Sequence, residues 1–331
     1  MANSNMLKRP PLGTLSQIIT DFIFFKRSLG YKYDNEEGVL YRFSLFTQNY
    51  TVNGYEIPTQ MIEEWLSLRK GEKVATQISR YPCTLQMLNY AREHGYHVRL
   101  PEVPKFHVSK YVPYIFTESE LEKLYYASDH IKPYPGSMRH FKVPVLFRLI
   151  YGCGLRASEA ANLKCSDVDF SCRVITIREG KLGKDRLVPL ADSLSKIMQQ
   201  YDLRFNESSD RDSYFFKGKY NEKLSRSRIY RWFRLCLETA GIPHYGKGKG
   251  PREHDLRHSF CVHSLKRMQD AGIDLYAFLP ILSTYVGHAS IHATQHYLRL
   301  TAEFYPDLLK QINKTCSGII PSWEANEDET Y

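Results

Sequence analysis

The chain has 331 residues, more than one hydrophobic core usually serves, so we expect two domains. Its 43% hydrophobic and 24% charged residues exclude a largely disordered chain, and the lack of an apolar run of about 18 residues excludes a membrane-spanning helix. The 45 lysines and arginines against 36 acidic residues give a net charge of +9, which favours a polyanionic partner without establishing one.

The N-terminal part of the chain carries apolar side chains at intervals of three and four residues, the pattern of amphipathic helices. We predict helices over residues 14–30 and 36–50, and a third that starts near Thr59, whose hydroxyl can cap it. A fourth helical segment covers residues 74–93. Pro82 lies inside it and should kink it or split it in two, because proline lacks the backbone N–H that a helix needs.

A linker follows these helices. Residues 100–114 contain three prolines and few helix signals, which predicts extended chain. Thr117 and Glu120 then have the spacing of a capping box, which marks the start of a new helix. We therefore predict three parts: a helical domain over residues 1–105, a linker over 106–114 and a second domain over 115–331.

The second domain is predicted to combine helices with one small sheet. Helices are expected over residues 143–151 and 156–170, and again over most of the chain from the sheet to about residue 315. Residues 173–180 and 186–190 alternate or are β-branched, and the glycine- and lysine-containing segment between them has the character of a hairpin turn. The expected fold class is mainly α with a small antiparallel β-sheet (α+β).

Side chains that bind phosphate recur along the second domain. In chain order they are Arg156, Lys181, His254, Arg257, His288 and Tyr297. Each residue alone is weak evidence for a functional site. Tyr297, for example, is one of 24 tyrosines, and a tyrosine with apolar neighbours usually belongs to a core. Chance does not readily produce all six in one order, so we treat them as one set.

Four motifs resemble those of the tyrosine recombinases, the phage-integrase and Xer class. They are GLRASEAANL, GKLGKDRLVPL, HDLRHSF and a GH followed nine residues later by tyrosine. The likeness covers about residues 113–312 and extends more loosely to the helical N-terminal part, and LPILSTYVGHASIHATQHYL also resembles transposon-borne members. The resemblance implies a site-specific recombinase or integrase that mobilises or integrates a genetic element, as in transposition.

The resemblance assigns a role to each residue of the set. Tyr297 would attack phosphorus, giving a 3′-phosphotyrosine bond and a free 5′ hydroxyl. Arg156 and Arg257 would hold the phosphate, because a guanidinium stays charged and presents paired donors. His254 would act as the base for the tyrosine or as another phosphate donor, and His288 would hydrogen-bond a non-bridging oxygen.

The leaving 5′ oxygen needs a proton, which the resemblance assigns to Lys181, with Lys184 in the same turn as its rival. Glu159 follows Arg156 by three residues on one helix face and would hold that arginine in place. We expect no cofactor and no metal, because cationic side chains take the role of a metal pair. The seven scattered cysteines have no zinc-site spacing, and as free thiols they fit a cytoplasmic protein.

Further DNA contacts are predicted at basic residues of the linker, the hairpin turn, the RSRIYRWFR segment and the GKGKG loop. These are Lys105, Lys110, Lys184, Arg226, Arg228, Arg231, Lys247 and Lys249. A solvated amphipathic helix explains RSRIYRWFR equally well. His258 and His263 are expected to face the core or neighbouring DNA, and His292 and His296 receive no role.

The family resemblance also implies an assembly. A helical core-binding domain and a mixed catalytic domain would form a C-shaped clamp on double-stranded DNA recombination sites, with a homotetramer acting on two sites. Sister recombinases or accessory proteins could take part, and residues 303–314 could pack on a neighbouring protomer. No membrane partner is expected, and the polar N-terminus has no secretory signal, which favours the cytoplasm.

Two other functions stay open at this point. The first is a DNA-binding protein that occupies sites without cutting, in which Tyr297→Phe would leave every activity unchanged. The second is an enzyme similar to type IB topoisomerases, which would relax any supercoiled plasmid without a sequence requirement.

Overall fold

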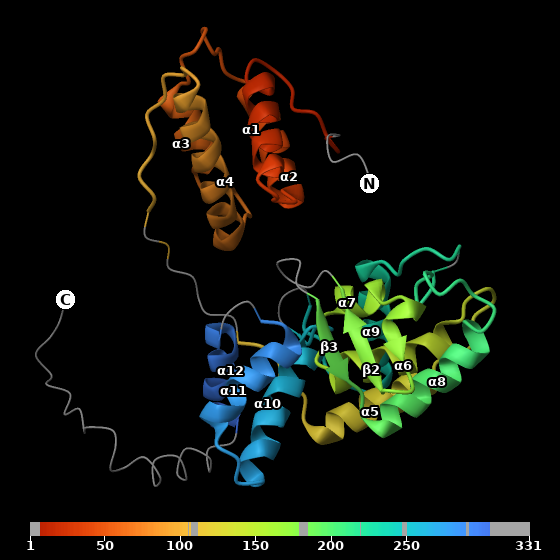
Figure 1. Cartoon of the computed structure of the whole chain (residues 1–331). Coiled ribbons are helices and arrows are strands. Elements are labelled where there is room, and N and C mark those ends of the chain that lie inside the picture. The colour runs from red at the N-terminus through yellow and green to blue at the C-terminus, as the bar shows by residue number, and fades with distance from the viewer. Residues whose placement is uncertain are drawn as a thin grey trace, which may run out of the picture. The chain divides into compact units, whose positions relative to one another are not determined.

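A computed structural model describes residues 7–104, 106, 112–178, 185–218, 220–246, 250–288 and 291–304. The chain divides into two compact units, residues 1–111 and 112–331, and the division falls inside the predicted linker. Figure 1 shows the helices of the first unit and the helices and sheet of the second. None of the helices in the described ranges has the length and apolar character needed to cross a membrane.

The first unit consists of four helices around one core, as the periodicity predicted. They are α1 (Ser16–Ser28), α2 (Asp34–Thr47), α3 (Thr59–Leu66) and α4 (Val74–Glu93). Each helix contributes buried side chains to this core, among them Phe22, Phe43, Trp65 and Met87. The aromatic rings of Phe43 and Trp65 pack with their centroids 5.2 Å apart.

Two predictions for this unit differ from the structure in detail. Pro82 was expected to kink or split the fourth helix, and the split does not occur, since α4 continues through Pro82 as one helix. Tyr81 and Cys83 on either side of the proline are buried in the core, and this packing offsets the missing backbone hydrogen bond. Thr59 does not cap α3: it is the first helical residue, and Pro58 occupies the capping position without a side-chain hydrogen bond.

The second unit contains the remaining helices and the sheet. The elements are α5 (Glu118–Asp129), α6 (Arg139–Gly152), α7 (Ala157–Asn162), the 3₁₀ turn η1 (Cys165–Asp167), β1 (Val168–Asp169), β2 (Val174–Ile177), β3 (Arg186–Pro189), α8 (Asp192–Phe205), α9 (Arg226–Thr239), α10 (Asp255–Asp270), α11 (Leu275–Val286) and α12 (Ile291–Phe304). The predicted capping box at the start of α5 is confirmed, since the Thr117 hydroxyl accepts from the Glu120 N–H at 3.2 Å and Glu120 returns the contact.

The sheet has three antiparallel strands in the order β1-β2-β3. The predicted antiparallel pairing of β2 with β3 is confirmed, with Ile177 opposite Arg186. The helix predicted over residues 156–170 was wrong, because α7 ends at Asn162. The Leu163 carbonyl accepts from the Phe215 N–H at 2.7 Å, and the Cys165 N–H donates to the Ser213 carbonyl, so this stretch leaves the helix to pair with another segment.

Two hydrophobic cores meet in the second unit. One lies among α5, α6, α8, α9 and the sheet, and the other lies among α10, α11 and α12, which gather beside the sheet in Figure 1. Helix α10 belongs to both, since Leu256 packs in the first core and Cys261 in the second. The first turn of α10 therefore lies at the junction of the two cores.

Candidate active site

Arg156 immediately precedes α7 and is fixed from two directions. Its Nη1 donates to Oε1 of Glu159 at 2.6 Å, and its backbone N–H donates to the other carboxylate oxygen at 2.9 Å. Its Nη2 donates to the carbonyl of Gly287 at 3.2 Å, at the end of α11. The side chain keeps 21% of its surface exposed, so the guanidinium can meet a ligand from solvent.

Arg257 lies in the first turn of α10 and is almost fully buried, with 1% of its side chain exposed. Its Nη1 donates to the carbonyl of Gly154 at 2.8 Å and lies 3.8 Å from a carboxylate oxygen of Glu159. Its Nη2 has no hydrogen-bond partner within the described part of the chain. A buried donor without a partner is costly, so this Nη2 is able to take a further acceptor such as a bound anion.

Glu159 joins the two arginines to a third, Arg186 on β3, which the sequence analysis did not predict. The two terminal nitrogens of Arg186 each donate a hydrogen bond to one carboxylate oxygen of Glu159, at 2.8 and 3.1 Å. Its Nε donates to the Tyr285 carbonyl at 2.9 Å. Burial alone would raise the pKa of Glu159, but Arg186 and Arg156 hold that pKa at about 2. The carboxylate therefore stays ionised and ties α7, β3 and α10 together.

We expect Glu159→Gln to destabilise the fold by about 3–5 kcal/mol, because it leaves a buried cluster of guanidiniums without its anion. The folded pKa of Glu159 is lowered from 4.5 to about 2, so its stabilising effect is complete above pH 4.5 and is lost as the pH falls through about 2. Urea unfolding at several pH values measures both effects. Asp129→Asn is the matched control, because that carboxylate pairs with Arg148 at a more exposed position and its loss should cost less than about 1 kcal/mol.

Two glycines with left-handed backbone place the carbonyls that hold the arginines. Gly154 has φ +58° and accepts from Arg257, while Gly287 has φ +67° and accepts from Arg156. A Cβ at Gly154 would lie 2.5 Å from the Phe260 ring, and a Cβ at Gly287 would lie 2.8 Å from the Arg186 guanidinium. Both positions therefore require glycine for conformation and for space.

We expect Gly154→Ala to lower the free energy of unfolding by about 2–5 kcal/mol, from backbone strain together with overpacking against Phe260. Gly272→Ala is the matched control, since Gly272 has φ +73° but nothing lies within 4 Å of the position that its new methyl group would take. It should lose only the strain energy of about 1–2 kcal/mol. If thermal or urea unfolding shows the same loss of stability for both variants, the Phe260 ring moves aside without destabilising the fold.

Tyr297 on α12 is buried, with 3% of its surface exposed, and its hydroxyl points to α10. The hydroxyl lies 2.8 Å from Nδ1 of His258, and the Cys261 thiol is also beside it. His258 in turn packs edge-on against the ring of His254, with centroids 4.7 Å apart. The sequence analysis gave His258 no part in the reaction, and its position one residue after Arg257 was the one signal available.

His288 follows Gly287 and completes this group. Its Nδ1 lies 2.8 Å from the Thr294 hydroxyl, which fixes the orientation of the ring. The ring is nearly parallel to that of Tyr297, at 11° and with centroids 5.8 Å apart. Four segments thus bring Arg156, His254, Arg257, His288 and Tyr297 to the junction of the two cores.

Burial and neighbouring cations keep His254 and His258 neutral. Burial lowers the pKa of His254 to about 4, helped by Arg257 and Arg156. Burial also lowers the pKa of His258 to about 3, helped by His254, Arg252, Arg257 and His296. Burial likewise raises the pKa of Tyr297, against the opposing charge of Arg257. Near neutral pH both rings are therefore uncharged and the phenol keeps its proton.

Several predicted residues lie outside the described residues. These are Lys105, Lys110, Lys181, Lys184, Lys247 and Lys249, together with most of the segment 303–314. Within the described ranges, no group of three or more histidine, cysteine, aspartate or glutamate side chains could hold a metal ion.

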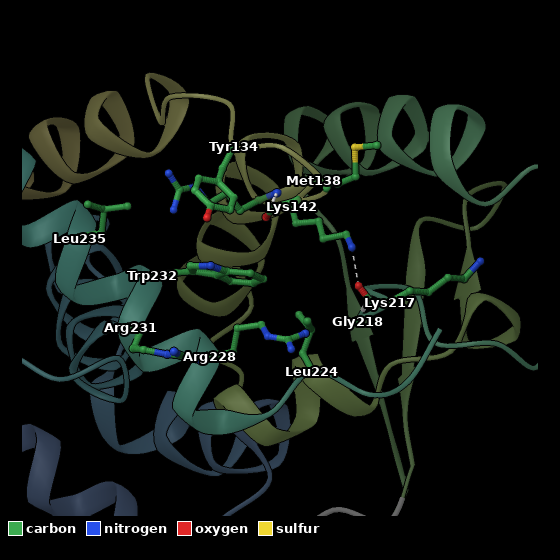
Figure 2. Close-up of a pocket in the computed structure, with 13 residues that line it drawn as sticks. Tyr134, Met138, Lys142, Lys217, Gly218, Leu224, Arg228, Arg231, Trp232 and Leu235 are labelled. Carbon is green, nitrogen blue, oxygen red and sulfur yellow. Dashed lines mark hydrogen bonds between the residues drawn. The ribbon is translucent and has the colours of Figure 1, made fainter. Parts of the chain in front are cut away.

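The predicted DNA-contact residues of α9 are described. Arg226 is exposed and lies 4.0 Å from Glu253, the residue before His254. Arg228 and Arg231 line a pocket of about 730 Å³ on one face of α9. Figure 2 shows Trp232 and Tyr134 in this pocket, and the Lys142 ammonium donating to the Lys217 carbonyl at its edge. The pocket therefore combines cationic groups with aromatic faces.

Comparison with known proteins adds to this geometry. Residues 115–303 match the model of the phage integrase family. The chain belongs to the phage integrase family. It is a tyrosine site-specific recombinase, as the sequence motifs predicted, and the α+β fold class is confirmed as well.

Relatives in two other organisms support this assignment. Tyrosine recombinase XerA of Pyrococcus furiosus is 34% identical over 224 residues, which cover 67% of this chain and 68% of the relative. The protein y4rB of Sinorhizobium fredii, which carries the name integrase/recombinase, is 28% identical over 311 residues, or 92% of this chain and 98% of y4rB.

A solved structure shares the fold. It is a lambda integrase tetramer bound to a Holliday junction, with a TM-score of 0.59 and 16% sequence identity. The match covers 88% of this chain and 80% of the lambda integrase chain.

Proposed function

We propose that this recombinase cuts and rejoins DNA through a 3′-phosphotyrosine bond at Tyr297. The observation that carries this proposal is the position of Tyr297 near Arg257 and Arg156, close enough for both positive charges to act on the pKa of its hydroxyl, while Nη2 of Arg257 is buried without a hydrogen-bond partner among the described residues. A phosphodiester oxygen is an acceptor of the right charge for that position. Tyr297 would form the bond to phosphorus while the 5′ oxygen leaves.

The roles of the surrounding residues follow from their positions. Arg156 and Arg257 would neutralise the charge that gathers on the non-bridging oxygens in the transition state. His254 and His288 would donate hydrogen bonds to the same phosphate. Lys181, in the segment that links β2 to β3 along the chain, would protonate the leaving oxygen, and Lys184 is the alternative.

The proposed substrate is double-stranded DNA that carries recombination sites. Arg226, Arg228 and Arg231 of α9 would contact its backbone, together with the basic residues of the linker and loops. The lambda integrase structure holds four protomers on a junction, which supports a homotetramer here. The name of the Sinorhizobium relative supports DNA integration. The resemblance of the motifs to transposon-borne members extends the proposal to transposition of a mobile element. We also place this enzyme in the cytoplasm, in keeping with a DNA substrate and free cysteine thiols.

A trapping assay tests this function. A duplex site is obtained by selection from random sequences and from the ends of the element that encodes the chain. It is nicked next to the cleavage point so that religation fails, and is incubated with protein and EDTA. We expect a protein–DNA band on a denaturing gel, and mass spectrometry should place the nucleotide on the peptide that contains Tyr297.

Two outcomes would contradict the proposal. The first is a nucleotide attached to one of the other tyrosines. The second is DNA binding in native gels with no covalent band on any selected site, which would favour a binding protein without cleavage. Relaxation of any supercoiled plasmid, whatever its sequence, would instead favour the topoisomerase alternative.

A further inference from the structure

We propose that His258 is a catalytic residue that takes the phenolic proton of Tyr297 during attack and returns it when the strands are rejoined. This inference rests on the proposed function. It assigns the base to a histidine that lies outside the set predicted from the sequence motifs.

Geometry is the first argument. The Tyr297 hydroxyl is 2.8 Å from Nδ1 of His258, a normal hydrogen-bond length for proton transfer. Tyr297 and His258 lie on different helices, α12 and α10, which share the smaller core around Cys261. The contact is therefore fixed by packing on both sides.

The other two histidines of the site, His254 and His288, make contacts that suit other roles. His254 meets His258 ring to ring and lies beside Arg257 and Arg156, where an oxygen of the phosphate would bind. His288 uses Nδ1 for Thr294 and presents its ring face to the Tyr297 ring, a stacking contact. His258 is the histidine that the hydroxyl itself contacts.

The charge state of the pair also fits. Burial, with His254, Arg252, Arg257 and His296 around it, holds the pKa of His258 at about 3, so the ring is neutral near pH 7. In the tautomer that carries its proton on Nε2, Nδ1 accepts the hydrogen bond from the Tyr297 hydroxyl. Burial and the charges of Arg252 and Arg257 oppose a positive charge on the His258 ring in the free protein. The negative scissile phosphate would offset them, so proton transfer becomes favourable only when DNA occupies the site.

The step balances as follows. The Tyr297 oxygen forms a bond to phosphorus, and its proton moves to Nδ1 of His258. The bond from phosphorus to the 5′ oxygen breaks, and that oxygen receives a proton from the general acid, proposed as Lys181. Rejoining reverses each transfer, so no external oxidant, reductant or energy source is needed.

His258→Asn tests the role, because the asparagine amide oxygen can accept the hydrogen bond near the Nδ1 position but cannot take up the proton. His263→Asn is the matched control. His263 lies on the same helix, is buried, and makes the same 2.8 Å contact from Nδ1 to a tyrosine hydroxyl, that of Tyr151. The probe is the nicked duplex from the trapping assay.

We expect His258→Asn to bind the duplex normally and to form the covalent adduct about 10²–10⁴-fold more slowly, as loss of a general base predicts. His263→Asn should stay within about threefold of the unchanged chain. If His258→Asn does not fold, His258→Gln provides the same comparison, since it also accepts a hydrogen bond without taking the proton.

A second measurement separates proton transfer from positioning. Fluorotyrosine at position 297 has a more acidic phenol and depends less on a base, so it should narrow the rate difference between the unchanged chain and His258→Asn. An unchanged difference would overturn the catalytic role and leave a positioning one. Adduct formation by His258→Asn at the normal rate overturns this inference alone, whereas no adduct from the unchanged chain overturns the proposed function with it.

Discussion

Tyr297→Phe should abolish covalent adduct formation and recombination, a loss on the order of 10⁴-fold or more, while DNA binding and the fold persist. The substitution removes the single oxygen that would bond to phosphorus, and a neighbouring tyrosine cannot replace it because the hydroxyl is held between α10 and α12. The folded state loses one hydrogen bond to His258, worth about 1 kcal/mol. Single-turnover cleavage of the nicked duplex, native gels and urea unfolding measure the three effects.

Tyr151→Phe is the matched control for this experiment. Tyr151 makes the same hydroxyl contact to a histidine of α10, His263, at 2.8 Å. It should lose a similar amount of stability and retain cleavage. A Tyr297→Phe chain that still forms the adduct would place the nucleophile elsewhere in the chain.

Arg156→Lys should slow adduct formation by about 10²–10³-fold with little change in DNA affinity. Lysine keeps the positive charge but cannot hold Glu159 and Gly287 and still present a second planar donor to a phosphate. The loss should therefore appear in the rate constant at saturating protein. A loss confined to affinity would show that Arg156 only attracts DNA.

Arg148→Lys is the control for Arg156→Lys. Arg148 also forms a two-point contact with a carboxylate, at 2.7 Å to each oxygen, but its partner is Asp129 of α5 and not Glu159. It should leave the cleavage rate unchanged. If both variants slow cleavage equally, a general loss of folding stability explains the effect.

Local patterns in the sequence predicted most of the fold. The Thr117–Glu120 capping box, the antiparallel pairing of β2 with β3 and the four N-terminal helices depend on residues close together in the chain, and each is confirmed. The errors arose where contacts between distant residues determine whether a helix continues or ends. Core packing carries α4 through Pro82, and pairing of Leu163 with Phe215 ends the helix that the sequence continued to residue 170.

The candidate site shows the same division. The six motif residues could be named because their order along the chain resembles a known family. Arg186 and His258 could not, because their significance lies in contacts with Glu159, 27 residues away, and with Tyr297, 39 residues away. Helical periodicity predicts which face of α10 is buried. It does not predict which side chain of α12 contacts that face.

The arginine cluster around Glu159 has a consequence for the whole fold. Three guanidiniums share one carboxylate, which leaves an excess of two positive charges largely withdrawn from water, and burial together with Arg156 lowers the pKa of Arg257. Under the proposed function, the scissile phosphate would then act as the counter-ion of this cluster as well as the substrate. DNA would complete the electrostatics of the catalytic unit, so we expect the free protein to be less stable than its DNA complex. By mass action alone, a cognate duplex at about 100 times its Kd adds about 2.7 kcal/mol to the free energy of unfolding.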